Sequence, residues 1–410
     1  MTRPAGSSWP DKGLTRIPYD VYADPAIYER ERARLFMGPT WNYLALECEI
    51  PKPGDYKTTT VGDVPVIVVR GADGAINGFE NRCAHRGALL CLQRFGHVRA
   101  ITCVYHAWSY DLEGRLKGVA FQNGVKGAGG MPRDFRREDH RLRPLTIATF
   151  AGLVFGSFDP APPPLADYLG PDIAGRIRRV LPRPVKVLGY NTQVLRNNWK
   201  LYVENVKDQY HASILHLFFT TFRLNRLSQK GGIIVDGSGG HHVSYSMIDG
   251  DAGERDYAAA ALRSDSESFG LKDPTLLDGR DEFGDGITLQ ILTVFPTLVL
   301  QQIQNSLVVR QIVPKGIDRT EVVWTYYGFE DDDSALAEFR LKQSNMVGPA
   351  GYISMEDGAV GAFVQRALPG AADDTSIVMM GGAGADSQET RATETSIRGF
   401  WKAYRRLMDL

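Results

Sequence analysis

Two short segments of the chain each carry one cysteine and one histidine. Seventeen residues separate Cys83-x-His85 from Cys103-x-x-His106. Thiolates and imidazoles are metal ligands, and a zinc finger pairs like with like, as two cysteines and then two histidines. Here each segment offers one ligand of each type. The pattern therefore suits two metal atoms with different ligands better than a structural zinc.

A Rieske [2Fe–2S] centre has this requirement, because one iron takes two cysteines and the other takes two histidines. The segments CAHRG (83–87) and CVYH (103–106) resemble the two ligand loops of Rieske domains. We therefore expect Cys83, His85, Cys103 and His106 to hold such a cluster. The other cysteines, Cys48 and Cys91, and the histidines His97 and His140 match neither loop, and we interpret them as free thiols and ordinary polar residues.

A second group of ligand residues lies in WKLYVENVKDQYHASILHLFF (199–219). It contains Glu204, Asp208, His211 and His216. On a regular helix His211 and His216 would lie about 140° apart, so we expect the helix to bend or end between them. Two histidines and one carboxylate form the facial set of non-haem Fe(II) oxygenases. Taken alone, this block would fit equally well two polar histidines on an ordinary helix.

With the upstream cluster motif, this block resembles the ring-hydroxylating oxygenase large subunits. The resemblance implies that His211 and His216 bind iron, and that Asp208 bridges an iron-binding histidine to the cluster ligand His106 of a neighbouring subunit. It places the third ligand in SMEDGA (354–359), where Asp357 is the first choice and Glu356 the alternative. We group Glu204 with Asp208 as a further catalytic carboxylate.

The surrounding sequence divides into three parts. We expect residues 1–40 to form a segment with a helix at 25–36 that packs on the catalytic domain. Residues 41–160 contain short apolar runs separated by turn signals, which predicts a small antiparallel β Rieske domain. A proline-rich hinge precedes residues 161–410, which predict a catalytic domain. There we expect helices around 199–217 and 394–407 and extended segments at 241–247 and 288–314. The fold class is α+β, with an antiparallel sheet flanked by helices in a helix-grip-like arrangement.

Composition excludes several classes of partner and location. The chain has 410 residues, 47 basic and 48 acidic, with a net charge of −1 and no basic block, so neither nucleic acid nor an anionic membrane is expected. No signal-peptide pattern or long apolar run is present, which predicts a cytoplasmic protein. Four cysteines are too few for a disulfide framework.

Two arginines are candidates for substrate binding. Arg310 stands inside the apolar run NSLVVRQIV, and Arg391 lies in ETRATET. A guanidinium binds a carboxylate through two parallel hydrogen bonds, so together they would suit a dicarboxylate. The alternative is structural: Arg310 pairs with an internal acid and Arg391 caps a helix.

Longer segments, including NNWKLYVENVKDQYHAS and GPAGYISMEDGAVGAFVQRAL, are similar to the terephthalate 1,2-dioxygenase group of that family. This implies cis-dihydroxylation of an aromatic carboxylate with O₂, a mononuclear Fe(II), a small β subunit in an α₃β₃ hexamer, and electrons from NAD(P)H. The chain lacks a dinucleotide-binding fingerprint, so the reductase should be a separate polypeptide. The salicylate 5-hydroxylase group, which adds one hydroxyl, is the alternative, followed by oxygenases for other aromatic carboxylates.

Two other classes of protein remain as alternatives. A pure electron carrier would need the cluster motif alone and would not consume O₂. A zinc-dependent hydrolase would use His211, His216 and Asp357 but would have no need of a redox cluster.

Overall fold

The computed structural model describes residues 9, 13–247, 257, 259, 270–371 and 373–410. The chain forms two compact units, one of Phe36–Leu165 and one of Met1–Leu35 with Ala166–Leu410. In the described residues no helix is both long enough and apolar enough to cross a membrane.

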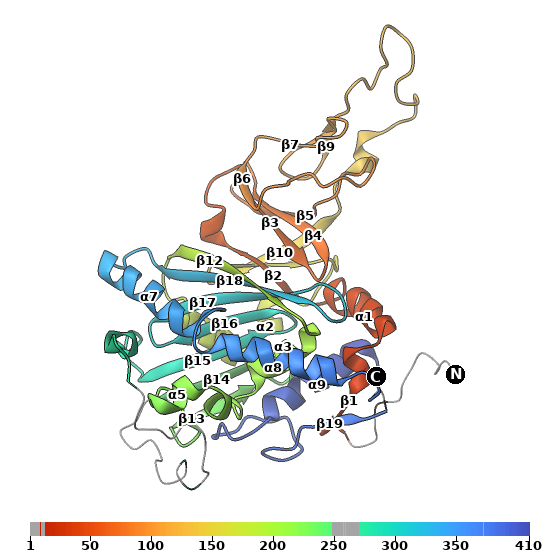
Figure 1. Ribbon diagram of the computed structural model, residues 1–410. Coiled ribbons are helices and arrows are strands. Elements are labelled where there is room, and N and C mark those ends of the chain that lie inside the picture. Colours follow the sequence, from red (N-terminus) through yellow and green to blue (C-terminus); the bar gives the residue numbers. More distant parts are fainter. Residues whose placement is uncertain (1–8, 10–12, 248–256, 258, 260–269, 372) are drawn as a thin grey trace. The chain divides into compact units, whose positions relative to one another are not determined.

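The regular secondary structure of the unit of residues 36–165 consists mainly of antiparallel strands (Figure 1). A seven-stranded sheet has the order β2-β11-β10-β5-β4-β3-β6, and a three-stranded sheet has the order β7-β8-β9. The strands are β2 (Asn42–Leu46), β3 (Asp55–Val61), β4 (Val64–Arg70), β5 (Ile76–Glu80), β6 (Phe95–His97), β7 (Ile101–Thr102), β8 (Ser109–Tyr110), β9 (Leu116–Gly118), β10 (Pro144–Phe150) and β11 (Leu153–Ser157).

The two cysteine–histidine segments are loops between these strands. Residues 83–88 lie between β5 and β6, and residues 103–108 lie between β7 and β8. Both cysteines belong to one buried core cluster that also holds Phe79, Trp108 and Tyr110. The loops are therefore anchored by their cysteines on a packed apolar base.

The other unit is centred on a second seven-stranded antiparallel sheet, with the order β12-β18-β17-β16-β15-β14-β13. Its strands are β12 (Val185–Leu195), β13 (Gly231–Val235), β14 (His242–Met247), β15 (Ile287–Val294), β16 (Leu298–Ile303), β17 (Ser306–Pro314) and β18 (Thr320–Phe329). A separate pair joins β1 (Arg16–Pro18) to β19 (Thr375–Ile377).

The helices of this unit come from distant parts of the sequence. They are α1 (Pro25–Glu31), continued by a wider π-type turn (Arg32–Phe36), α2 (Leu165–Val180, interrupted at Gly170), α3 (Trp199–Lys207), α4 (Ala212–Leu215), α5 (Leu217–Thr221), α7 (Ser334–Val347), α8 (Ser354–Ala367) and α9 (Thr395–Met408). Short 3₁₀ turns occur in this unit at Tyr19–Tyr22 and Pro274–Leu277. The unit of residues 36–165 has such turns at Glu47–Glu49 and Arg137–His140.

Strand β15 shows that helices cover both faces of the sheet. The Nε2 of Gln290 donates to the carbonyl oxygen of Arg176 on α2, 3.1 Å away. Its neighbours Leu289 and Ile291 point to the opposite face, where they line a cavity with residues of α3 and α8. Successive side chains of a strand alternate between faces, so α2 and the pair α3 and α8 lie on opposite sides.

The α+β fold class predicted from the sequence is confirmed, because a small antiparallel β unit accompanies a sheet flanked by helices. The helix predicted around 199–217 does break between His211 and His216, since α4 ends at Leu215. However, α3 already ends at Lys207, earlier than expected. The final helix is α9, within one residue of its predicted limits.

Candidate metal centres

The two cysteine–histidine loops have the same backbone hydrogen bonds. The N–H of Cys83 donates to the oxygen of Ala88 (2.8 Å), and the N–H of Gly87 donates to the oxygen of Cys83 (2.9 Å). In the other loop the N–H of Cys103 donates to Trp108 (2.8 Å), and that of Ala107 donates to Cys103 (3.0 Å). Each cysteine is thus held at the start of an equivalent turn.

The fifth residue of each turn has a positive φ, +76° at Gly87 and +53° at Ala107. A positive φ costs a glycine little but is unusual for alanine. Both loops nevertheless adopt this conformation at the same position. We infer that the turn is needed to place the cysteine and histidine side chains of each loop.

Within the two loops the thiols are buried and the imidazoles are exposed. Cys83 and Cys103 are each 3 % exposed. The ring centroids of His85 and His106 are 4.7 Å apart, and His85 also stacks on Trp108. Paired sulfurs inside and paired ring nitrogens outside match a [2Fe–2S] cluster whose two irons take different ligands. The donor set therefore fits this group.

A third cysteine lies in the same core but away from the two turns. Cys91 is buried, and burial raises the pKa of its thiol to about 11. A thiol with so high a pKa is a poor ligand and a poor nucleophile, which agrees with its interpretation as a free thiol.

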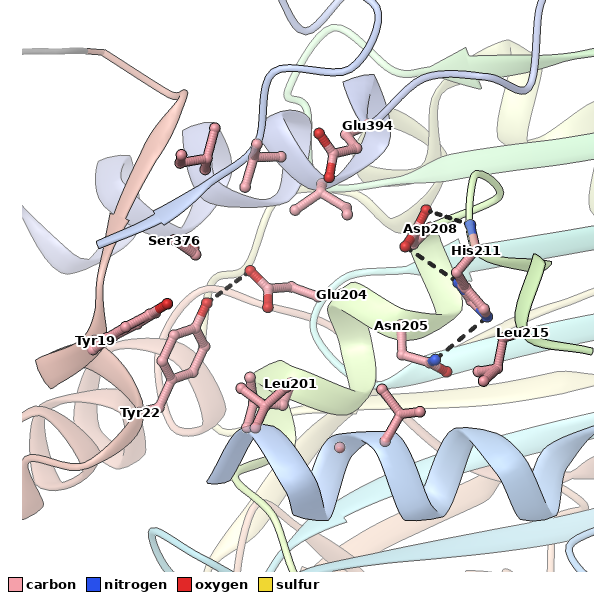
Figure 2. Close-up of a pocket in the computed structure, with 16 residues that line it drawn as sticks. Tyr19, Tyr22, Leu201, Glu204, Asn205, Asp208, His211, Leu215, Ser376 and Glu394 are labelled. Carbon is pink, nitrogen blue, oxygen red and sulfur yellow. Dashed lines mark hydrogen bonds and ion pairs between the residues drawn. The ribbon is translucent and has the colours of Figure 1, made fainter. Parts of the chain in front are cut away.

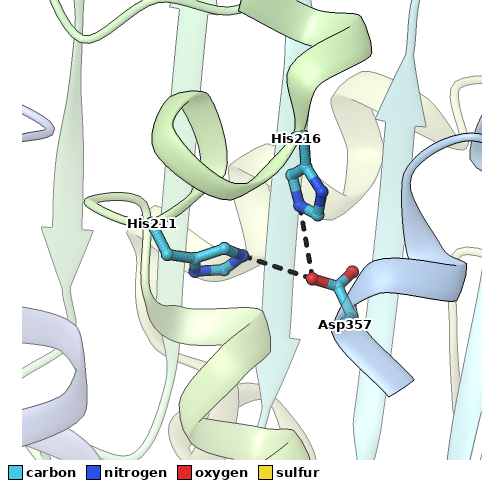
Figure 3. A group of neighbouring side chains, drawn as sticks. All are labelled: His211, His216 and Asp357. Carbon is cyan, nitrogen blue, oxygen red and sulfur yellow. Dashed lines mark ion pairs between the residues drawn. The ribbon is translucent and has the colours of Figure 1, made fainter. Parts of the chain in front are cut away.

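The second metal group brings together His211, His216 and Asp357 (Figure 3). One ligand atom from each lies within 4.8 Å of the other two. The Oδ1 of Asp357 is 3.3 Å from Nε2 of His211 and 3.2 Å from Nε2 of His216. Two imidazoles and one carboxylate that converge in this way form the donor set of a mononuclear non-haem iron.

The opposite nitrogen of each imidazole faces a second carboxylate. Nδ1 of His211 is 3.2 Å from Oδ2 of Asp208, and Nδ1 of His216 is 2.8 Å from Oε2 of Glu356. Such contacts fix the ring orientation and direct the free nitrogen towards a metal. The two adjacent acids on α8 thus have different positions: Asp357 lies against Nε2 of both imidazoles, and Glu356 lies behind His216.

The electrostatics of the group follow from these contacts. Burial would lower the pKa of His211, but the carboxylates of Asp208 and Asp357 raise it to about 10. The pKa of Asp357 is held far below its usual range despite burial, because both imidazoles lie against it. The negative charge of Asp357 is therefore available to a cation.

A local turn explains how His211 reaches this position. The helix α3 ends at Lys207, and the Oδ1 of Asp208 accepts hydrogen bonds from the backbone N–H groups of Tyr210 (2.8 Å) and His211 (3.2 Å). An aspartate that accepts from the N–H groups two and three residues ahead forms an Asx turn of the kind found at helix N-termini, so it starts a new turn of the chain after α3. Asp208 therefore both shapes the chain and contacts the ring of His211.

Asn205 is a member of this site that sequence reasoning missed. Its Nδ2 donates to Oδ1 of Asp357 (3.1 Å) and lies 3.4 Å from Nε2 of His211. It lies on α3, six residues before His211. An asparagine in a helix carries no specific signal, so only the contact with Asp357, 152 residues away, reveals it.

A small cavity of about 40 Å³ adjoins the side chains of His211, His216 and Asp357. We call it the catalytic cavity. Its walls are largely apolar, formed by Val206, Phe219, Leu289, Ile291, Ile303 and Ile353. An aromatic ring fits such walls, since the hydrophobic effect favours burying its faces.

Arg310 places a cation in the wall of this cavity. It is 3 % exposed, donates to the hydroxyl of Tyr202 (3.0 Å) and lies over the ring of Trp324 (4.8 Å). No salt bridge of Arg310 is found among the described residues, so the internal acid considered from the sequence is not observed. A buried arginine that faces a cavity is suited to bind an anionic ligand.

Arg391, the other arginine predicted to bind substrate, does not line the catalytic cavity. It is 1 % exposed, and its guanidinium donates to Oδ1 of Asn225 and to the carbonyl oxygen of Arg226. Asn225 lines the cavity, whereas Arg391 does not. The guanidinium of Arg391 therefore contacts the far side of Asn225, and the side chain of Asn225 lies between it and the cavity.

Glu204 likewise lies apart from the ligands. Its Oε1 accepts hydrogen bonds from the hydroxyl of Tyr22 (2.8 Å) and from Nε1 of Trp401 (2.6 Å). Burial raises its pKa to about 7, an effect reinforced by the charge of Asp208. Figure 2 shows that Glu204, Asp208 and Glu394 line one cavity, here called the acidic cavity, which His211 also lines.

Comparison with known proteins defines the class of this protein. Residues 40–128 match the Rieske [2Fe–2S] domain, and residues 181–410 match the catalytic domain of the ring-hydroxylating alpha subunit. The chain therefore belongs to the alpha subunits of ring-hydroxylating dioxygenases, which are oxidoreductases that use a Rieske cluster and a mononuclear iron. The pure electron carrier and the zinc hydrolase considered above are wrong.

Three relatives cover nearly the whole chain. The chain is 59% identical to the terephthalate 1,2-dioxygenase terminal oxygenase component subunit alpha 2 of Comamonas sp., over 98% of this chain and 97% of the relative. It is 46% identical to the anthranilate 1,2-dioxygenase large subunit of Burkholderia cepacia, over 98% of this chain and 95% of the relative. It is 40% identical to the salicylate 5-hydroxylase large oxygenase component of Ralstonia sp., over 99% of this chain and 97% of the relative.

The fold agrees with a solved structure of the class. Naphthalene 1,2-dioxygenase from Rhodococcus sp., bound to indole, superposes with a TM-score of 0.79 at 25% identity, covering 96% of this chain and 94% of the other.

Proposed function

We propose that this alpha subunit catalyses the 1,2-dioxygenation of terephthalate. The observation that carries the proposal is Arg310, a buried cation in the wall of the cavity beside the iron ligands. The 59% identity to a terephthalate 1,2-dioxygenase alpha subunit supports the same substrate. In the overall reaction terephthalate, O₂, NAD(P)H and one proton give the cis-dihydrodiol dicarboxylate and NAD(P)⁺.

In this proposal the metal groups have the following ligands. Cys83 and Cys103 hold one iron of the cluster, His85 and His106 hold the other, and His211, His216 and Asp357 hold the mononuclear iron. When bound, the cluster supplies single electrons and the mononuclear iron supplies the activation of O₂. Glu356 and Asp208 orient the two imidazoles, and Asn205 donates to the ligand carboxylate.

The chain's own side chains then position the substrate. The apolar walls bury the ring, and Arg310 binds one carboxylate, so that the ring edge is held beside the iron ligands. Exclusion of water by these walls protects the reaction from side reactions. Arg391 stays a predicted contributor to carboxylate binding, although it lies behind Asn225.

The assembly follows the resemblance to the family. We propose that Asp208 accepts a hydrogen bond from His106 of a neighbouring copy, so that an electron crosses between subunits. The remaining partners are a small β subunit in an α₃β₃ hexamer and a separate NAD(P)H-dependent reductase. The side chain of Asp208 is 20 % exposed and lines the acidic cavity, which supports its access to such a partner.

A single-turnover experiment tests the substrate. The protein is loaded with iron, its cluster is reduced anaerobically, and terephthalate, salicylate or anthranilate is added before O₂. A dihydrodiol dicarboxylate from terephthalate is the expected product. Gentisate from salicylate without any terephthalate product would instead support the salicylate 5-hydroxylase alternative, and turnover of anthranilate alone would place the protein among oxygenases for other aromatic carboxylates.

A further inference from the structure

The catalytic cavity contains a second polar position besides Arg310. Asn225 follows α5, is 1 % exposed and lines the cavity. Its Oδ1 accepts a hydrogen bond from Arg391, whereas its Nδ2 has no acceptor among the described residues. A buried N–H group without a partner is costly, so a side chain in this state is suited to bind a ligand oxygen.

The orientation of this amide is determined by its neighbour. Oxygen and nitrogen of an asparagine amide are normally assigned from hydrogen bonding. Arginine can only donate, so the atom of Asn225 that faces Arg391 must be the oxygen. Nδ2, the donor, is therefore the group available to a ligand in the cavity. The hydrogen bond from a cation also polarises the amide and strengthens that donor.

The cavity as a whole is rich in donors. Nε2 of Gln301 and Nε of Arg310 are also buried without a partner among the described residues, and both residues line the cavity. They belong to β16 and β17, whereas Asn225 belongs to the turn after α5. Acceptors also line the cavity, namely Oε1 of Gln209, which is buried without a partner among the described residues, and the carboxylates of Asp208 and Asp357. Donors from separate elements suit a ligand with more than one anionic group.

We propose that Asn225 binds the second carboxylate of the substrate through Nδ2, and that Arg391 is a positioning residue that fixes this amide from behind. The inference rests on the proposed function, since it divides the two carboxylates of terephthalate between Arg310 and Asn225. A dicarboxylate needs both Arg310 and Asn225. A monocarboxylate such as benzoate needs only one of these two side chains, so it can still bind to the other when one is substituted.

The test compares N225D with the wild type by anaerobic binding titrations of the iron-loaded protein. The substituted side chain can still accept from Arg391, but it presents an oxygen to the substrate instead of an N–H. We expect terephthalate to bind about 100-fold more weakly, because two acceptors face each other, and benzoate to change less than about threefold. Iron content and the cluster spectrum should not change.

A matched ligand and a matched variant sharpen the test. In 4-carbamoylbenzoate one carboxylate is replaced by an amide that can donate, so N225D should bind it more tightly than terephthalate, reversing the wild-type preference. The control N345D makes the same change on an exposed position of α7, where Asn345 donates to Lys342, and should preserve that preference. An unchanged ratio of terephthalate to benzoate affinity in N225D would overturn the proposal.

A double-mutant cycle tests the role of Arg391. R391K keeps the charge but cannot reproduce the two contacts to Asn225 and Arg226. If Arg391 acts through Asn225, R391K weakens terephthalate binding in the wild type and has no further effect in N225A. Independent, multiplicative losses would show a direct contact with substrate and would overturn the positioning role. If the wild type itself binds no terephthalate, the proposed substrate fails, which is a separate outcome.

Discussion

Nδ1 of His216 lies 2.8 Å from Oε2 of Glu356, on the side of the imidazole away from Asp357. The adjacent acids of α8 therefore hold opposite sides of one histidine. A carboxylate behind a ligand histidine fixes its ring and raises its basicity.

Removal of this supporting carboxylate should weaken iron binding without abolishing it. E356A is expected to lower the affinity for Fe(II) by about 10- to 100-fold, because the ring of His216 loses its orienting partner. Fe(II) titration of the metal-free site with a chelator competitor measures this. H211A, which removes a ligand, should bind no mononuclear iron while its cluster spectrum persists. Equal affinities for E356A and the wild type would show that Glu356 has no such role.

Replacement of Asp208 by asparagine should separate the two centres functionally. D208N retains a hydrogen-bonding side chain of the same size but loses the charge that faces Nδ1 of His211. Hydrogen bonds to charged groups contribute about 1.5–3 kcal/mol, which corresponds to about 10- to 100-fold in rate. Stopped-flow measurement of cluster oxidation should show this slowing with both centres loaded. An unchanged rate would remove Asp208 from the electron path.

Arg310 should determine the preference for dicarboxylates. Truncation of a buried arginine that binds an anion costs several kcal/mol, so R310A is expected to weaken terephthalate binding by about 100-fold. Benzoate should lose much less, because Asn225 remains for its single carboxylate. Equal losses for the two ligands would show that Arg310, through Tyr202 and Trp324, is structural.

Glu204 should make stability depend on pH. Its pKa is about 7 in the folded protein, because burial raises it from the usual value near 4.5. The folded state thus binds more protons at Glu204 than the unfolded state between these values, so the contribution of this residue to stability is full below about pH 4.5 and is lost as pH rises to 7. The loss amounts to at most about 3 kcal/mol.

The variant E204Q keeps the acceptor for Tyr22 and Trp401 and cannot ionise. Its melting temperature should decline less than that of the wild type between pH 5 and pH 8. Parallel melting curves across this range would contradict a proton on Glu204.

Short-range patterns in the sequence indicated much of the chemistry. The spacing of Cys83, His85, Cys103 and His106 indicated a cluster with two kinds of iron, because each loop is a local unit whose shape depends on a few neighbouring residues. The five-residue offset of His211 and His216 required a break in the helix, since a regular helix cannot direct both side chains to one point. In the structure Asp208 and the end of α4 provide that break.

Only the tertiary structure separated Asp357 from Glu356, placed Asn205 beside the ligands and moved Arg391 behind Asn225. These relationships join residues 140 to 166 positions apart, and no local pattern distinguishes one of two adjacent acids or the partner of a buried arginine. The types of ligand were thus determined by the sequence itself, whereas their roles depended on which side chains the packing of α3, α8 and the sheet brought into contact.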